Sequence, residues 1–183
     1  MNESLADFLP TTTVVLSIGI NPSLHAVRAG YPFAFVRNRF WPALNGSRLV
    51  HAPLQPGAAA VAELGSRYGI GFTDVVKRAT PGMKGLRALD FNRDVPLLRA
   101  KIERCRPAIL WFQGKVAARE FLVRNGISEH AITWGEQSYV IASARVFIAP
   151  NPSPANASYR LPDFIAAYDA LAIMRERIID PSN

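Results

Sequence analysis

Cysteine is almost absent from this chain of 183 residues, which contains only Cys105. A single cysteine excludes an internal disulfide, a zinc site of four thiolates and an iron–sulfur cluster. The three histidines, His25, His51 and His130, show no paired spacing typical of metal ligands. The sequence therefore predicts no metal site, and Cys105 is interpreted as a packed thiol.

Long hydrophobic runs are also missing. No stretch approaches the roughly 18 uninterrupted apolar residues that indicate a membrane-spanning helix. The first residues, M-N-E-S-L-A-D-F, lack the basic and apolar regions of a signal peptide. Neither G-x-G-x-x-G nor G-x-x-x-x-G-K-[ST] occurs, which disfavours a common nucleotide-binding protein. We expect an intracellular protein that does not bind a membrane.

Positive charge is in excess. Lysine and arginine number 21 against 14 aspartate and glutamate residues, for a net charge of +7. This excess indicates affinity for a polyanion such as nucleic acid. The length and a hydrophobic content of 49% predict one globular domain over residues 1–183.

Apolar runs and helical patterns alternate along the chain, which predicts a parallel sheet with helices on both faces. The predicted strands cover 13–20 and 108–114, followed by S-Y-V-I-A and R-V-F-I-A-P. Predicted helices include 92–105 and a last helix from Pro162 to Ile179. S-L-H-A-V-R-A-G-Y-P-F-A is expected to be an irregular segment. In such sheets ligands bind beyond the carboxyl ends of the strands, where G-I-N-P-S, Q-G-K and A-P-N-P-S-P-A-N should converge.

A series of motifs resembles family 2 of the uracil-DNA glycosylase superfamily, the mismatch-specific uracil and thymine DNA glycosylases. The motifs follow the family's order from about residue 13 to residue 171. They are G-I-N-P-S, G-Y-P-F-A, N-R-F-W, Y-G-I-G-F-T-D-V-V, T-P-G, F-Q-G-K and N-P-S-P-A-N.

The resemblance implies a three-layer α/β/α fold with a mostly parallel four-stranded sheet. It further implies a monomer that needs no cofactor and acts on double-stranded DNA with a deaminated or mismatched base. Such an enzyme flips the target nucleotide into a pocket and hydrolyses its glycosidic bond. The expected location is the cytoplasm, with the nucleoid.

Asn21 is the first catalytic candidate. Breaking the glycosidic bond gives the sugar oxocarbenium character, so the attacking water must be held in line with the bond more than it must be deprotonated. An amide carbonyl can accept a hydrogen bond from that water, and Pro22 restricts the conformations of Asn21. An ordinary Asn-Pro turn is the alternative interpretation.

Asp74 is the second catalytic candidate and departs from the family pattern, in which thymine glycosylases carry an amide at this position and some relatives a lysine. A carboxylate there can accept the N3–H of uracil or polarise the water, although it would repel a departing anion unless its pKa is tuned. A helix N-cap or a turn is the alternative.

The resemblance assigns five residues to the base pocket. Phe33 would stack on the flipped base, with core packing as the alternative. Backbone N–H groups of Gly19 and Ile20 would bind a pyrimidine oxygen. Asn38 would brace the wall. Asn151 stands where the fastest uracil glycosylases carry a histidine, which predicts a slow enzyme.

DNA contacts are predicted in three loops. Ser153 has a hydroxyl suited to a phosphate, and the residues after it, Pro154, Ala155 and Asn156, would enter the gap left by the base without a large wedge.

Lys115 follows Gly114 at a helix start suited to phosphate, with a solvated lysine as the alternative. Thr80 is a further candidate for phosphate contact. Ser23 replaces the family's usual glycine, and it either narrows the pocket or reaches a phosphate.

Three functional alternatives stay open at this point. The same fold could act on hypoxanthine, xanthine or a modified pyrimidine, with Asp74 deciding the base. The chain could instead bind damaged DNA without cleaving it, although Asn21 and Phe33 argue against this. An unrelated α/β nucleotide-binding protein is disfavoured by the missing phosphate-loop motifs.

Overall fold

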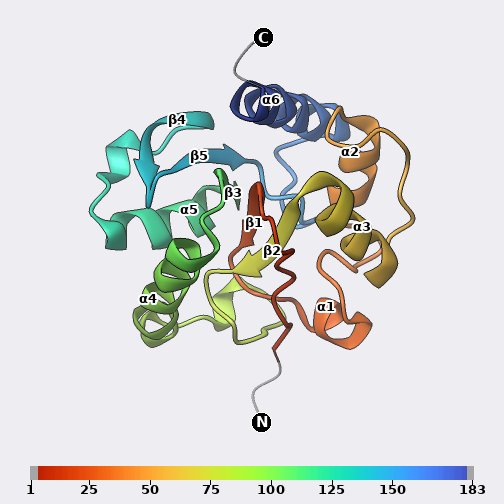
Figure 1. Ribbon diagram of the computed structural model, residues 1–183. Coiled ribbons are helices and arrows are strands. Elements are labelled where there is room, and N and C mark those ends of the chain that lie inside the picture. Colours follow the sequence, from red (N-terminus) through yellow and green to blue (C-terminus); the bar gives the residue numbers. More distant parts are fainter. Residues whose placement is uncertain (1–3, 181–183) are drawn as a thin grey trace.

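A computed structural model describes residues 4–180, which form one five-stranded sheet with helices on both faces (Figure 1). The strands are β1 (Val15–Gly19), β2 (Ile70–Asp74), β3 (Ile109–Gln113), β4 (Gly135–Ile141) and β5 (Ala144–Ala149). Their order is β2-β1-β3-β5-β4, and all neighbours are parallel except β4 and β5. The predicted α/β/α class is confirmed, but the sheet has five strands rather than four.

Residues 4–180 contain six α-helices. They are α1 (Leu24–Ala29), α2 (Phe40–Gly46), α3 (Ala58–Tyr68), α4 (Ala88–Cys105), α5 (Lys115–Leu122) and α6 (Leu161–Ile179). Short 3-10 turns are η1 (Met83–Gly85), η2 (Val123–Asn125) and η3 (Glu129–Ala131). Figure 1 shows α4 and α5 on one side of the sheet and α2, α3 and α6 on the other. Within residues 4–180, no helix is both long and apolar enough to cross a membrane.

The strands bury apolar side chains on both faces because successive residues point in opposite directions. Val15 and Trp111 pack in the cluster that includes α2, α3 and α6. Their neighbours Leu16 and Phe112 pack in the cluster that includes α4 and α5. This two-sided burial explains why the strands read as continuous apolar runs in the sequence.

Two local features differ from the expectations. The segment after Asn21 contains α1, which Ser23 caps by accepting a hydrogen bond from the Ala26 amide and which ends at Gly30 with φ 76°. The strand predicted at S-Y-V-I-A is β4, and it pairs antiparallel with β5 through a turn at Ala142 and Ser143, both with positive φ. These residues lack the Asn-Gly or Asp-Gly signal of a tight hairpin, so the antiparallel pairing was not predicted.

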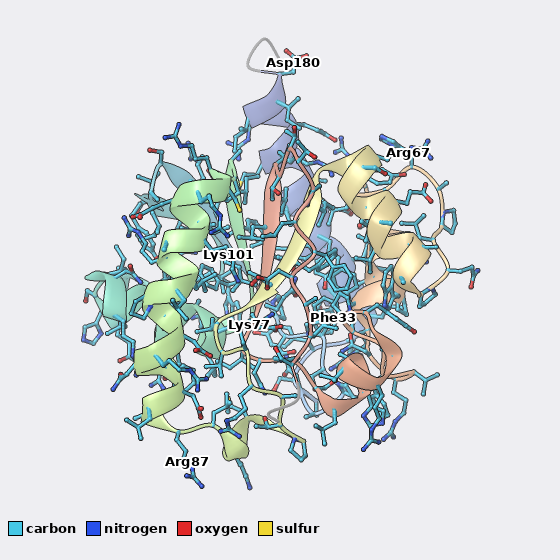
Figure 2. The ribbon with its side chains drawn as sticks, turned by 60° about the horizontal axis from the view of Figure 1, so that its bottom comes forward. Phe33, Arg67, Lys77, Arg87, Lys101 and Asp180 are labelled. Carbon is cyan, nitrogen blue, oxygen red and sulfur yellow. The ribbon has the colours of Figure 1, made fainter. Side chains whose placement is uncertain are left out.

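The four parallel strands end at the same edge of the sheet, where their last residues lie close to one another. These residues are Gly19, Asp74, Gln113 and Ala149. Figure 2 turns this edge forward, and Phe33 and Lys77 lie near it while Asp180 lies at the far end. The functional loops follow from this edge.

Candidate active site

A pocket of about 730 Å³ lies beyond the carboxyl edge of the sheet. Every residue that the sequence predicted for catalysis, base binding or DNA binding lines this pocket. They are Gly19, Ile20, Asn21, Ser23, Phe33, Asn38, Asp74, Thr80, Gly114, Lys115, Asn151, Ser153, Pro154, Ala155 and Asn156. The structure thus brings them together, while their chemical roles stay predictions.

The side chain of Asn21 is held in one orientation by the loop that follows β2. Its Nδ2 donates to Thr80 Oγ1 at 2.8 Å, to the carbonyl of Arg78 at 3.1 Å and to the carbonyl of Pro22 at 3.2 Å. Carbonyl oxygens can only accept, so the amino group must face them and Oδ1 must face away. No residue within 4–180 donates a hydrogen bond to Oδ1. The carbonyl of Asn21 is therefore available to a donor in the pocket.

Thr80 orients Asn21. Its hydroxyl is buried, accepts from Asn21 and donates to the carbonyl of Gly82 at 2.9 Å. A phosphate contact requires the single hydroxyl proton, which is already used. Without DNA this proton is engaged by the Gly82 carbonyl, so the observed contacts of Thr80 position Asn21, and its phosphate contact stays a prediction.

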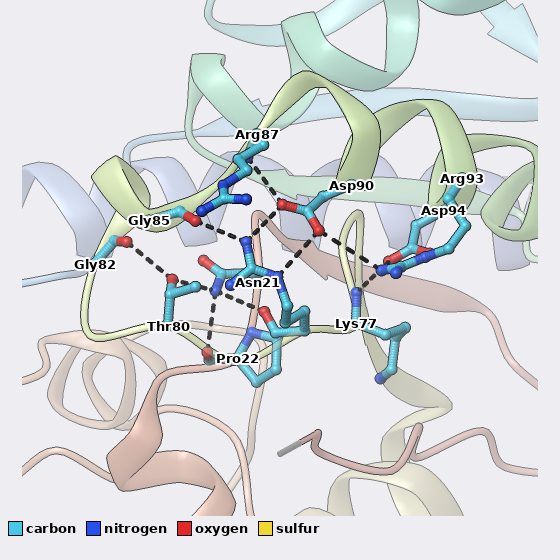
Figure 3. A network of polar contacts seen from close by, with 11 residues as sticks. Asn21, Pro22, Lys77, Thr80, Gly82, Gly85, Arg87, Asp90, Arg93 and Asp94 are labelled. Carbon is cyan, nitrogen blue, oxygen red and sulfur yellow. Dashed lines mark hydrogen bonds and ion pairs between the residues drawn. The ribbon is translucent and has the colours of Figure 1, made fainter. Parts of the chain in front are cut away.

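The loop that carries Thr80 is anchored to the start of α4 (Figure 3). Arg78 donates through Nε and Nη2 to the two carboxylate oxygens of Asp90, at 3.0 and 2.6 Å, and through Nη2 to the carbonyl of Gly85. The hydrogen bond from Arg78 is the main reason that the pKa of Asp90 falls to about 2. In addition, the amide of Lys77 donates to Asp94 at 2.8 Å. These contacts fix the backbone that holds Asn21.

Phe33 forms an aromatic wall. Its ring stacks on Phe40 with centroids 4.1 Å apart and meets Phe72 edge-on at 6.3 Å. Its φ of 57° is unusual for a bulky residue. Packing against Phe40 stabilises this strained conformation, and the half-buried ring lines the pocket. The core contact and the predicted stacking contact are compatible, because only part of the ring is used by the core.

Asp74 ends β2, and its carboxyl lies against β1. A Cβ at position 19 would lie 2.5 Å from Asp74 Oδ1, so a side chain there would displace this carboxyl from its place against β1. Burial raises the pKa of Asp74 to about 6, and Asp7 raises it further while Lys77 and Lys101 lower it. No helix begins after Asp74 before η1. The helix N-cap alternative for Asp74 is therefore wrong.

A charged cluster lies behind Asp74. Asp7 accepts from Lys77 at 2.9 Å, from Lys101 at 2.5 Å and from the Thr73 hydroxyl at 2.7 Å. Burial alone would raise the pKa of Asp7, but the hydrogen bonds from Lys101, Lys77 and Thr73 together hold it below its usual value. Figure 2 shows Lys77 and Lys101 on the same side of β2. Both cations are engaged by Asp7, so they only partly offset the burial of Asp74.

The opposite wall is the loop after β5. Asn151 Oδ1 accepts from the Ser153 amide at 2.9 Å, and its backbone carbonyl accepts from Asn156 Nδ2 at 3.0 Å. Ser153 Oγ accepts from the Ala155 amide at 3.3 Å, which leaves its proton for an acceptor. The side chain of Asn156 is tied back, while Pro154 and Ala155 are exposed. The small tip expected of this loop is present.

Gly114 and Lys115 form the turn from β3 into α5. Gly114 has φ 103°, and a Cβ there would lie 3.0 Å from Asn151 Cβ, so glycine lets the two loops approach. The ammonium group of Lys115 lies 4.8 Å from the ring centroid of Trp134. Lys115 is therefore half-buried and in contact with an aromatic ring, not fully solvated.

Ser23 and Asn38 line the pocket just before two helices, and Ser23 caps the first of them, α1. The Ser23 hydroxyl accepts from Ala26 at 3.1 Å at the start of α1. Asn38 Oδ1 accepts from the Phe40 amide at 2.9 Å at the start of α2. The bracing role of Asn38 stays a prediction.

Sequence reasoning missed several residues at the site, including Gln113, Trp134, Arg78 and Arg39. Gln113 lies at the end of β3, lines the pocket and donates to the buried Ser17 hydroxyl at 2.9 Å. Trp134 lines the rim with 43% of its surface exposed, which is unusual for so large an apolar side chain. A tryptophan four residues before the predicted strand S-Y-V-I-A was the available signal. Within residues 4–180, no group of three or more His, Cys, Asp or Glu residues could hold a metal ion.

The fold and the site together define an α/β protein with a neutral, oriented amide and an aromatic wall in a pocket at the carboxyl edge of its sheet. Residues 6–172 match the uracil DNA glycosylase superfamily, and the chain belongs to this superfamily. It is also similar to the solution NMR structure of a candidate uracil DNA glycosylase from Methanosarcina acetivorans. The TM-score is 0.63 at 17% identity, over 93% of this chain and 98% of that one. At this identity the likeness supports the fold alone.

Proposed function

We propose that the protein is a monofunctional DNA glycosylase that removes uracil from mismatched double-stranded DNA, with uracil opposite guanine as its leading substrate. The observation that carries the proposal is the fixed orientation of Asn21. Three acceptors hold its amino group, and its carbonyl is left for a donor in a pocket that Phe33 also lines.

The proposed reaction needs positioning more than basicity. As the glycosidic bond stretches, the sugar becomes strongly electrophilic and the base departs as an anion. Asn21 Oδ1 would accept a hydrogen bond from the attacking water and hold it on the face opposite the base. A flipped base loses its stacking neighbours in the duplex. Phe33 would replace one of them, and such stacking contributes roughly 1–3 kcal/mol to binding. Backbone N–H groups near Gly19 and Ile20 would stabilise the departing anion.

Strand cleavage is not expected. Lys115 is the only lysine among the described residues that line the pocket, and its ammonium group lies against the ring of Trp134. A Schiff base with the sugar would require an amine at the anomeric carbon, beside Asn21. The proposed product is therefore an intact strand with an abasic site.

The mismatch-specific subtype is supported by the motifs around Asn21, Phe33 and Ser153. The neutral Asn151 and the small tip at Pro154 and Ala155 favour a slow enzyme that flips bases most easily from weakened pairs. Uracil opposite guanine is such a pair.

A panel of duplexes tests the proposal. Uracil, thymine, hypoxanthine, xanthine or ethenocytosine is placed opposite each normal base, and alkali-sensitive sites are scored. We expect excision of uracil opposite guanine by the wild type, and a rate at least about 100-fold lower for Asn21→Ala because the water is no longer held in line. Asn92→Ala, an exposed position on α4, is the matched control and should keep the wild-type rate.

A second candidate keeps the reaction and changes the base. The half-buried Asp74 at the pocket favours it, because its raised pKa of about 6 keeps the carboxyl neutral in mildly acidic solution, where a carboxylic acid can donate as well as accept. Faster excision of hypoxanthine or xanthine than of uracil in the panel would support this candidate. Binding of damaged duplexes without any excision would instead support a damage-binding protein and contradict the proposed enzyme.

A further inference from the structure

Arg39 joins two loops of the site without lining the pocket itself. Its Nη2 donates to the carbonyls of Ser153, at 2.5 Å, and Asn156, at 2.7 Å, and its Nη1 donates to the carbonyl of Tyr159 at 2.6 Å. Its own backbone amide donates to the carbonyl of Pro152 at 3.0 Å. One residue thus binds four carbonyls of the loop that carries Ser153.

Besides its own internal hydrogen bonds, this loop has no regular secondary structure to hold its shape. Residues 150–160 contain no helix or strand, and they connect β5 to α6. Three separate carbonyls converge on a single guanidinium, which satisfies acceptors that regular structure does not. Removing that group would leave these carbonyls without the partner that fixes them relative to one another.

The guanidinium is well suited to this task and is not used elsewhere. Its Cζ lies 4.6 Å from the ring centroid of Phe164 on α6, so its plane is supported from one side. Among residues 4–180, no carboxylate forms an ion pair with it, in contrast to Arg78. A lysine carries the charge but lacks the planar fork that reaches several carbonyls at once.

We propose that Arg39 is a positioning residue that sets the loop 151–159 in its DNA-binding conformation before DNA arrives. The proposal rests on the proposed glycosylase function of the same site. Through the carbonyls of Ser153 and Asn156, Arg39 places the Ser153 hydroxyl at the rim, opposite Phe33. Because a preformed loop loses less entropy on binding, Arg39 contributes to DNA affinity more than to the rate of bond cleavage.

Hydrogen exchange tests the structural part of the proposal in the free protein, independently of any activity. The amides of Ser153, Ala155 and Asn156 all donate hydrogen bonds within the loop, to Asn151 Oδ1, Ser153 Oγ and the Ser153 carbonyl respectively. We expect them to exchange at least about tenfold faster in Arg39→Ala and Arg39→Lys than in the wild type. Arg67→Ala is the control, because Arg67 also stacks on an aromatic ring but lies on α3. Unchanged exchange in both Arg39 variants would overturn the proposal.

DNA binding tests the functional part. With a duplex that contains an abasic site, we expect Arg39→Ala to raise Kd by about tenfold, and Arg39→Lys by nearly as much, since preorganisation is lost in both. The single-turnover rate at saturating enzyme should change by less than about threefold, because Asn21 and Thr80 are untouched. A lower single-turnover rate with unchanged Kd would overturn the assignment.

Salt dependence separates positioning from a direct phosphate contact. If Arg39 acts through the loop, Arg39→Ala weakens binding without changing the slope of log K against log salt. If Arg39 touches a phosphate, that slope becomes shallower by about 0.9, as we expect for Lys115→Ala. A shallower slope for Arg39→Ala would therefore contradict the proposal.

A double-mutant cycle with Ser153→Ala completes the test. If Arg39 acts through Ser153, losing the Ser153 hydroxyl should weaken binding less in Arg39→Ala than in the wild type. Additive effects on Kd would overturn the proposal. If the wild type neither binds nor cleaves any damaged duplex, the proposed function fails, while the exchange experiment still reports whether Arg39 holds the loop.

Discussion

Asp74 is the proposed catalytic residue whose charge changes within the usual pH range of an assay. Burial raises its pKa from 3.8 to about 6, so it is protonated below pH 6 and ionised above it. If the carboxylate accepts the N3–H of uracil, the excision rate of the wild type should rise across pH 6 and level off near pH 8. The pH profile of Asp74→Asn should be flat over this range. An identical pH dependence and base preference in both proteins would contradict a catalytic Asp74.

The same shift has a consequence for stability, with the opposite sign. A raised pKa means that the folded state binds the proton more tightly than the unfolded state, so stability is lost as pH rises through 6. Above pH 6, Asp74→Asn should therefore have a free energy of unfolding higher than that of the wild type by on the order of 1–3 kcal/mol. It should unfold at a correspondingly higher urea concentration. The difference should shrink below pH 4, where the wild-type carboxyl is neutral in both states. Urea titrations at pH 4 and pH 8 measure it.

Single residues were predictable where a motif carried them. Asn21 and Phe33 stand in short, recognisable stretches, and the structure brings both to one pocket. Arg39 was missed because its contacts lie more than a hundred residues away in sequence, and nothing local distinguishes it from a surface arginine. The bond between Thr80 and Asn21 was not predicted, because the burial of Thr80 and this contact arise only on folding.

At the scale of elements, the start of α4 controls the loop that orients Asn21. Asp90→Asn removes the carboxylate that accepts two hydrogen bonds from Arg78 and one from the Arg87 amide. We expect the single-turnover excision rate to fall about tenfold or more, because the carbonyl of Arg78 and the Thr80 hydroxyl lose their fixed position. Binding to an abasic duplex should change little.

Glu103→Gln is the control for that prediction. Glu103 lies on the same helix and forms an exposed pair with Arg99, far along α4 from the loop. It should keep the wild-type rate. Equal rates for Asp90→Asn and the wild type would show that the loop holds Asn21 without the help of α4.

Helices and strands could be predicted where the pattern of apolar residues indicated which side chains are buried. β3 and α6 follow from continuous apolar and helical periodicity, and they match their predicted bounds within a residue. α1 was missed because Pro and Gly around a six-residue helix resemble a loop. β4 was expected as a strand, but its antiparallel place at the edge depends on Ala142 and Ser143 adopting positive φ, which their residue types do not predict.

At the scale of the whole molecule, the net charge of +7 should dominate DNA affinity at low salt. Each neutralised phosphate contributes about 0.9 to the slope of log K against log salt, so two contacts cost about tenfold in affinity between 50 and 200 mM salt. Anisotropy with a labelled duplex measures this slope. A salt-independent Kd would contradict a phosphate-binding rim around Ser153 and Lys115.

The fit between Gly19 and Asp74 also constrains how this protein can change. A methyl group at position 19 would meet the Asp74 carboxyl at 2.5 Å. A mutant library in which position 19 varies alone should yield inactive or unfolded clones. Active clones with a side chain at position 19 should carry a second substitution that shortens or removes the side chain of Asp74. Residue 19 on β1 and the residue proposed to select the base would therefore have to change together during evolution.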